Sequence, residues 1–126
     1  MVENQFVTDS SQVSLRPSRT RIKICGITRA VDAQAVAAAG ADAIGLVFTP
    51  KSKRWVSIAQ AQGMCAQLPP FVARVALFMD QTAAEVADVL QQIHIDLLQF
   101  HGQESAAFCA SFQRPFIKAL AMGGVD

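Results

Sequence analysis

From residue 21 onward, short apolar runs alternate with Ala-rich or amphipathic segments. The apolar runs predict strands at 22–25, 43–48, 74–79, 95–100 and 116–120. The segments between them predict helices at 31–39, from Ser57 to the Pro69-Pro70 pair, from Thr82, and at 104–112. This spacing is typical of βαβ crossovers, and strands that are apolar on both faces are typical of parallel sheets covered by helices. The pattern predicts an α/β protein with a parallel sheet.

Local signals support several of the predicted helix ends. Gly40 follows the segment 31–39 and stands where helices commonly stop. Ser57 and Gln60 have the spacing of a capping box, as do Thr82 and Glu85. These pairs predict that two helices begin just after Ser57 and Thr82.

Two architectures fit this alternation. A doubly wound open sheet of five strands can be complete in about 126 residues, and the length of the chain favours it. A (β/α)8 barrel needs at least ~200 residues, so the chain would cover only about its first half. The sequence stops just after the fifth predicted strand with no helix to follow, as expected for a barrel cut in mid-fold.

Composition and charge narrow the function classes. Hydrophobic residues make up 52% of the chain and charged residues 17%, which is typical of a globular domain. The net charge of +1 gives no sign of a nucleic-acid partner, and no apolar run is long enough to span a membrane. We expect residues 1–20 to be a disordered polar leader and residues 21–126 to form one domain.

The three cysteines indicate the compartment. Cys25, Cys65 and Cys109 have no metal-ligand spacing, so no metal site is predicted. An odd number of cysteines without a secretion signal suggests free thiols in a reducing environment, and we expect a cytoplasmic protein.

Polar side chains interrupt the predicted strands near their carboxyl ends. Lys23 and Cys25 share a face of the first strand, Gln99 and His101 share a face of the fourth, and Lys118 lies in the fifth. Ligands bind at the carboxyl ends of the strands in both candidate architectures, so these side chains are expected around one cavity. The alternative is that they are unrelated residues bonded to loop backbone.

A basic loop follows the second predicted strand and contains Lys51, Lys53, Arg54 and Trp55. The guanidinium group of arginine suits planar carboxylates and phosphates because it donates two parallel hydrogen bonds. The alternative is a solvated basic loop in which Trp55 packs over a helix end.

Several motifs, in order and properly spaced, resemble the phosphoribosylanthranilate isomerase family. They are KICGIT at 23–28, GADAIGLVF at 40–48 with KSKR at 51–54, VALFMD at 75–80, LLQFHGQE at 97–104 and PFIKAL at 115–120. The resemblance implies a (β/α)8 TIM barrel, of which this chain would be a truncated half barrel with four βα units and a fifth strand. It also implies an isomerase of tryptophan biosynthesis that uses no cofactor and no metal.

The family catalyses an Amadori rearrangement of N-(5′-phosphoribosyl)anthranilate to 1-(2-carboxyphenylamino)-1-deoxyribulose 5-phosphate, so the expected partner is a small phosphosugar. The resemblance makes Cys25 the general base and Arg54 the group that binds the anthranilate carboxylate. It makes His101 a substrate-binding or structural residue. Lys53 stands where the family usually has proline, which puts the loop conformation in question. From the residues themselves, Lys23 is a candidate to favour the Cys25 thiolate, and Gly26 should let backbone and substrate approach each other closely.

The resemblance also indicates what lies beyond residue 126. The family's general acid is an aspartate at the end of the sixth strand, and its phosphate site follows strands seven and eight. We therefore expect this chain alone to be inactive, with unpaired sheet edges that favour self-association or binding of a complementing C-terminal half. The alternatives are a non-catalytic half-barrel interaction module and a thiol redox protein, although the sequence has no CxxC motif.

Overall fold

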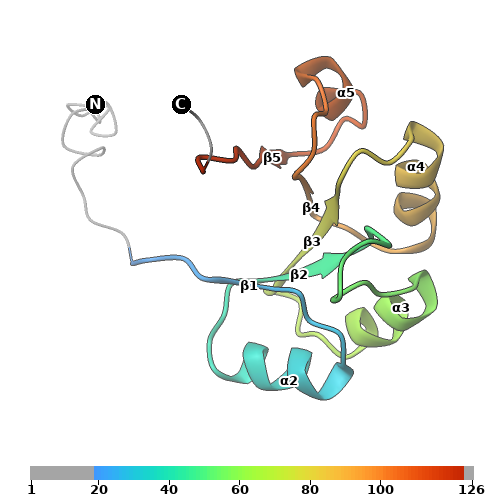
Figure 1. Ribbon diagram of the computed structural model, residues 1–126. Helices are drawn as coiled ribbons and strands as arrows, with labels where there is room; N and C mark the ends of the chain where they lie inside the picture. The colour runs from blue at the N-terminus through green and yellow to red at the C-terminus, as the bar shows by residue number, and fades with distance from the viewer. Residues whose placement is uncertain (1–18, 124–126) are drawn as a thin grey trace, which may run out of the picture.

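A computed structural model describes residues 19–123, which form five strands and four helices (Figure 1). The strands are β1 (Lys23–Cys25), β2 (Ala43–Val47), β3 (Ala73–Phe78), β4 (Leu97–Phe100) and β5 (Phe116–Lys118). The helices are α2 (Ala30–Ala38), α3 (Ile58–Ala66), α4 (Ala83–Gln92) and α5 (Ala106–Ala110). Of the predicted leader, only Arg19 and Thr20 belong to the described residues; positions 1–18 lie outside them.

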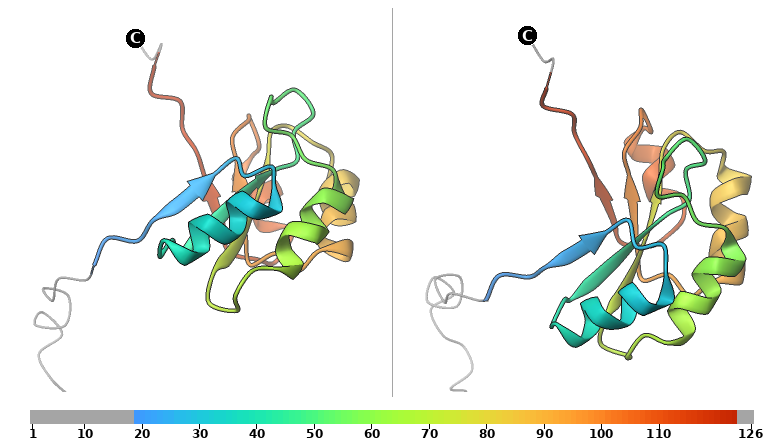
Figure 2. Two further views of the ribbon diagram at one scale, coloured as in Figure 1. Left: turned by 90° about the horizontal axis from the view of Figure 1, so that it is seen from below. Right: turned by 60° about the horizontal axis from the view of Figure 1, so that its bottom comes forward.

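Strand order separates the two candidate architectures. The sheet runs β1-β2-β3-β4-β5, and every neighbouring pair is parallel. The four helices lie along the same face of the sheet, as Figures 1 and 2 show from different sides. A doubly wound sheet reverses its strand order and has helices on both faces. The described residues are therefore an open part of a (β/α)8-type barrel, as the family resemblance implied, and the doubly wound alternative favoured by length is wrong.

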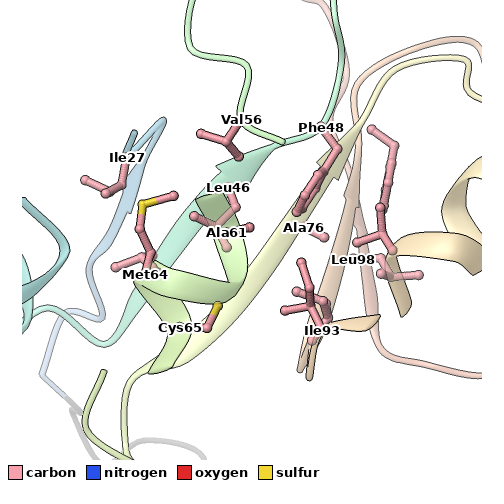
Figure 3. Packing of buried hydrophobic residues seen from close by; sticks show 14 of the residues in the cluster. Ile27, Leu46, Phe48, Val56, Ala61, Met64, Cys65, Ala76, Ile93 and Leu98 are labelled. Atoms are coloured by element: carbon pink, nitrogen blue, oxygen red, sulfur yellow. The ribbon is translucent and has the colours of Figure 1, made fainter. Parts of the chain in front are cut away.

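The main core lies between the sheet and its helices (Figure 3). Leu46, Ala76 and Leu98 point from the strands toward Ala61 and Met64 of α3 and toward Ile93. A row of aromatic rings continues this layer from Phe48 through Phe78 and Phe100 to Phe108 and Phe112, with neighbouring ring centroids 5.2–6.1 Å apart. Burial of apolar surface in this layer, at about 25 cal/mol per Å², attaches the helices to the sheet.

The opposite face of the sheet carries a smaller apolar cluster. Val47, Val75 and Leu77 form its centre, and Cys25 and Leu97 pack against it. Within residues 19–123, no helix covers this inner face, and β1 and β5 each pair on one side only. Ile117 of β5 is consequently 40% exposed. The inner face is thus accessible from solvent in the part of the barrel that is described.

The amino end of α3 has the predicted capping box. The backbone N–H of Gln60 donates to Ser57 Oγ at 3.1 Å, and the backbone N–H of Ser57 donates to Gln60 Oε1 at 2.9 Å. Each bond satisfies a backbone N–H at a helix start that would otherwise lack a partner. The sequence prediction for this helix start is confirmed.

We expect Ser57→Ala to lower the free energy of unfolding by about 1 kcal/mol, because it leaves the first turn of α3 without its cap. Urea unfolding of the 126-residue chain measures the change. Gln91→Ala, an exposed change away from any helix start, is the control and should shift the midpoint little. Equal midpoints for Ser57→Ala and the unmodified chain would contradict the prediction.

The last βα unit departs most from the sequence prediction. The helix expected at 104–112 spans only Ala106–Ala110, and Ser105 is its N-cap, accepting a hydrogen bond from the backbone N–H of Phe108 at 3.1 Å. Glu104 is drawn out of the helix by contacts with the ends of β3 and β5, described below. The fifth strand likewise ends at Lys118 and not at residue 120.

In residues 19–123, no helix combines the length and apolarity needed to cross a membrane.

Candidate active site

Cys25 is the last residue of β1 and lies half-buried on the inner face of the sheet. Its register partner is Gly45 of β2. A Cβ at position 45 would lie 3.0 Å from Cys25 Sγ and 3.1 Å from Leu77 Cδ1, closer than side chains normally pack. The glycine in β2 therefore makes the room that the thiol occupies, next to the apolar wall formed by Leu77.

Arg54 reaches across from the loop after β2 to the end of β1. Its Nη1 donates to the backbone oxygen of Cys25 at 3.3 Å. Gly26 lies beneath this side chain with φ of +80°, and a Cβ there would overlap the Arg54 side chain. Gly26 is needed both for its left-handed backbone and for this close approach. The group that lies close to Gly26 is the Arg54 side chain, and the predicted close approach of substrate at Gly26 stays a prediction.

The loop that carries Arg54 is held although Lys53 replaces the usual proline. The backbone N–H of Ser52 donates to Thr49 O at 3.0 Å, and the backbone N–H of Arg54 donates to Ser52 Oγ at 3.1 Å. Gln81, after β3, donates to Phe48 O at 2.7 Å and accepts from Thr49 Oγ1 at 3.1 Å. These bonds tie the loop to the neighbouring strand end, so Arg54 does not depend on proline for its position.

Arg54 and His101 line the same cavity at the carboxyl ends of the strands. This cavity of about 270 Å³ is also lined by Val47, Thr49, Lys51, Ser52, Leu77, Phe78 and Met79. A larger hollow of about 540 Å³, lined by residues such as Cys65 and Arg74, opens elsewhere, near the start of β3. In (β/α)8 barrels, chemistry occurs at the carboxyl ends of the strands, so the smaller cavity is the candidate site.

His101 follows β4 and is anchored at its backbone and at its ring. Its backbone N–H donates to Phe78 O at 2.9 Å, and its Nε2 lies 2.7 Å from the side-chain nitrogen of Gln99. This contact ties the His101 ring to the side-chain amide of Gln99. Gln99 is buried on the inner face, and its Oε1 has no hydrogen-bond partner among the described residues.

The five polar strand residues do not all meet at one cavity. Cys25, Gln99 and Lys23 are on the inner face by register and alternation. Lys118 pairs in register with Phe100 and so belongs to the helix-covered face, which corrects the prediction. Its ammonium group is bonded to Glu104, although it shares a second cavity of about 280 Å³ with His101.

The proposed pairing of Lys23 with Cys25 has no direct contact to support it. In the stretch 19–123, no hydrogen bond joins Lys23 to the thiol of Cys25, whereas Arg54 contacts the backbone of that residue. Arg54 is therefore the cation that the structure brings to the end of β1. Sequence reasoning did not find this contact, because the two residues are 29 positions apart.

Sequence reasoning also did not assign roles to Asp80 and Glu104. Asp80 ends the third unit with φ of +56°, its Oδ1 accepts from the backbone N–H of Gln103 at 2.7 Å, and its own N–H donates to Glu104 Oε2 at 2.8 Å. Burial raises the pKa of the Glu104 carboxyl, but hydrogen bonds from Lys118 and Asp80 outweigh it and hold the pKa below its ordinary value. Their positions just after apolar strands were the only signal in the sequence.

The parallel strands follow one another in sequence order, and the helices cover the outer face of the sheet. A thiol and a guanidinium lie at the strand ends. These features define a (β/α)8-type protein with a site at the carboxyl ends of its strands. The sequence profile of N-(5′-phosphoribosyl)anthranilate (PRA) isomerase matches residues 22–125. The chain belongs to this family.

Individual relatives agree with this assignment. The N-(5′-phosphoribosyl)anthranilate isomerase of Alcanivorax borkumensis is 59% identical over 102 residues, covering 81% of this chain and 47% of the relative. The crystal structure of the Thermotoga maritima isomerase has a TM-score of 0.78 at 39% identity, covering 81% of this chain and 51% of that chain. A phosphoribosyl anthranilate isomerase in complex with reduced 1-(o-carboxyphenylamino)-1-deoxyribulose 5-phosphate has a TM-score of 0.77 at 39% identity. The match covers 81% of this chain and 54% of that chain. The chain spans about half the length of the curated relatives it matches.

Proposed function

We propose that these residues belong to an isomerase of tryptophan biosynthesis that converts N-(5′-phosphoribosyl)anthranilate to 1-(2-carboxyphenylamino)-1-deoxyribulose 5-phosphate. One observation carries the proposal: a thiol ends β1 on the inner face, and Arg54 crosses Gly26 to reach the same strand end. The family match over residues 22–125 supports it independently. A cytoplasmic location fits a biosynthetic enzyme with three free thiols.

Cys25 is assigned as the general base. In the rearrangement, protonation of the ring oxygen opens the furanose to a Schiff base, and a base then takes the proton from C2′. The resulting enolamine tautomerises to the ketose, so the reaction needs one base and one acid and no net redox change. The thiolate is the basic form of Cys25. Its place at the carboxyl end of a barrel strand is where such groups act.

Arg54 and His101 are assigned to substrate binding. Arg54 uses one of its five N–H donors on the carbonyl of Cys25, and the others, which have no partner within residues 19–123, can bind the anthranilate carboxylate. His101 lines the same cavity, and its ring is held by a contact with the Gln99 side chain. The two residues would hold the aromatic end and the sugar end of the substrate against Cys25.

A polypeptide of these 126 residues should not catalyse the reaction by itself. The family resemblance places the general acid on a sixth strand and the phosphate site after strands seven and eight, and the described residues contain five strands. Removal of one member of an acid–base pair typically costs about 10²–10⁴-fold in rate. We infer that the open inner face and the free edges of β1 and β5 bind a C-terminal half of the barrel.

The test supplies that half from the Alcanivorax borkumensis isomerase, by fusing its segment beyond the matched region to residue 126. We expect the fusion to convert the substrate and to restore growth without tryptophan in a host lacking this isomerase. The 126-residue polypeptide alone should do neither, and adding the complementing segment in trans should restore part of the activity. A fusion that is folded by circular dichroism and monodisperse, yet inactive, would overturn the proposal.

A further inference from the structure

We propose that Asp80, Glu104 and Lys118 form a clasp that holds the turn after β4 and thereby positions His101 for the substrate. The inference rests on the proposed function for the identity of the substrate. The three residues come from the ends of β3, β4 and β5, and they meet at residues 101–104. They act through His101 and are positioning residues.

The clasp holds the turn from two sides. From the β3 side, the carboxylate of Asp80 accepts from the backbone N–H of Gln103 at 2.7 Å. From the β5 side, the ammonium group of Lys118 donates to the carbonyl of Gly102. Glu104 connects the two sides, since it accepts from the Asp80 N–H at 2.8 Å and pairs with Lys118 Nζ at 2.7 Å. The residues directly after His101 are therefore bonded to both neighbouring strands.

Gly102 shows how closely the clasp fits. A Cβ at this position would overlap the carboxylate of Asp80. The side chain of Asp80 thus lies flat against the backbone of the turn, and only glycine leaves space for it. Together with the bond from the His101 N–H to Phe78 O and the Gln99 contact at the ring, this fixes His101 at its backbone, ring and following residue.

The clasp is poorly suited to a purely stabilising role. The side chain of Glu104 is 3% exposed and that of Lys118 27% exposed, so both charges lose much of their hydration. Burying such a pair often adds little net stability compared with apolar residues of similar size. The pair instead fixes the position of the turn, because Lys118 bonds to the Gly102 carbonyl and Glu104 bonds to the backbone N–H of Asp80.

Lys118→Met tests the clasp in the fusion with the complementing segment. We expect kcat/KM to fall about 10- to 100-fold, because a displacement of a binding group by about 1 Å has effects of that size. Lys118→Arg retains the cation and should recover most of the activity. Glu104→Gln, which keeps the shape of the side chain, should lower kcat/KM as Lys118→Met does. Arg29→Met removes a cation from an exposed i,i+3 pair with Asp32 and is the control that should leave kcat/KM unchanged.

A double-mutant cycle with His101→Ala distinguishes positioning from general stabilisation. If the clasp acts through His101, Lys118→Met should change kcat/KM less than twofold when His101 is already alanine. An equal loss in both backgrounds would overturn the proposal.

A measurement without activity completes the test. Long-range ¹H–¹⁵N spectra of the fusion should show one set of His101 ring signals, and Lys118→Met should shift or broaden these signals because the ring is no longer held in one position. An unchanged His101 ring signal in Lys118→Met would contradict the clasp even if the fusion proved inactive. An inactive unmodified fusion with a responsive His101 signal would instead reject the proposed function and leave the clasp standing.

Discussion

Cys25→Ala in the fusion with the complementing segment should lower kcat by about 10²–10⁴-fold, the usual effect of removing a general base. The thiol ends β1 on the inner face, in space that Gly45 leaves open. Alanine keeps the strand and its packing but cannot accept the C2′ proton. Cys25→Ser should be nearly as impaired, because a hydroxyl is a far weaker base than a thiolate at neutral pH. Steady-state kinetics of substrate conversion measures both variants.

Cys65→Ala is the matched control for the loss of a thiol. Cys65 is buried on α3, away from the carboxyl ends of the strands, and burial raises its pKa. We expect this variant to lose stability through a small cavity while kcat stays within about twofold. Substrate affinity should also persist in Cys25→Ala, since Arg54 and His101 remain. Retention of more than a tenth of the unmodified kcat in Cys25→Ala would reject the assignment of Cys25 as the base.

Much of the fold could be predicted from local sequence, and the architecture could not. The runs at 43–48 and 74–79 predicted β2 and β3 to within one residue, because both of their faces are buried. Neither run contains information on strand order, which depends on how the helices cross over. Length therefore favoured the wrong, doubly wound arrangement, whereas the family motifs indicated the barrel.

The last unit shows how tertiary contacts override local signals. Glu104 resembles a first-turn helix residue by its charge, but it bonds to Asp80 and Lys118, 24 and 14 positions away. Helix α5 consequently begins after Ser105, a residue with good N-cap chemistry. Lys118 was misplaced for a related reason: alternation within a strand shows which residues share a face, but only its register with Phe100 shows which face it is.

The candidate site, like the fold, could be predicted from the sequence only in part. Cys25, Arg54 and His101 could be selected from motifs, and the last two do line one cavity. A close approach at Gly26 could be predicted, but not that Arg54 makes it, and the need for Gly45 beside Cys25 could not be foreseen, because these contacts join residues far apart in the sequence. Whether each of the three selected residues acts as assigned stays a prediction, which the variants test.

Arg54→Met should raise KM about 10- to 100-fold, the effect expected when a hydrogen-bonded charge partner of the substrate is lost. Arg54 is tied to the end of β1 by its bond to the Cys25 carbonyl, so its guanidinium lies at the strand end that carries the assigned base. Because the carboxylate does not change during the reaction, its binding is uniform, and most of the effect should fall on KM with a smaller loss in kcat. Arg54→Lys should recover only part of the substrate affinity lost in Arg54→Met, since an ammonium lacks the planar pair of donors.

A substrate without the carboxylate makes the Arg54 prediction specific. With the analogue in which aniline replaces anthranilate, the unmodified fusion and Arg54→Met should have similar kcat/KM, because the carboxylate assigned to Arg54 is absent. Lys53→Met, which removes the neighbouring exposed cation, is the control and should change KM little with either substrate. If Arg54→Met instead lowered kcat/KM equally for both substrates, Arg54 would act by holding the end of β1 through the Cys25 carbonyl and not by binding the carboxylate.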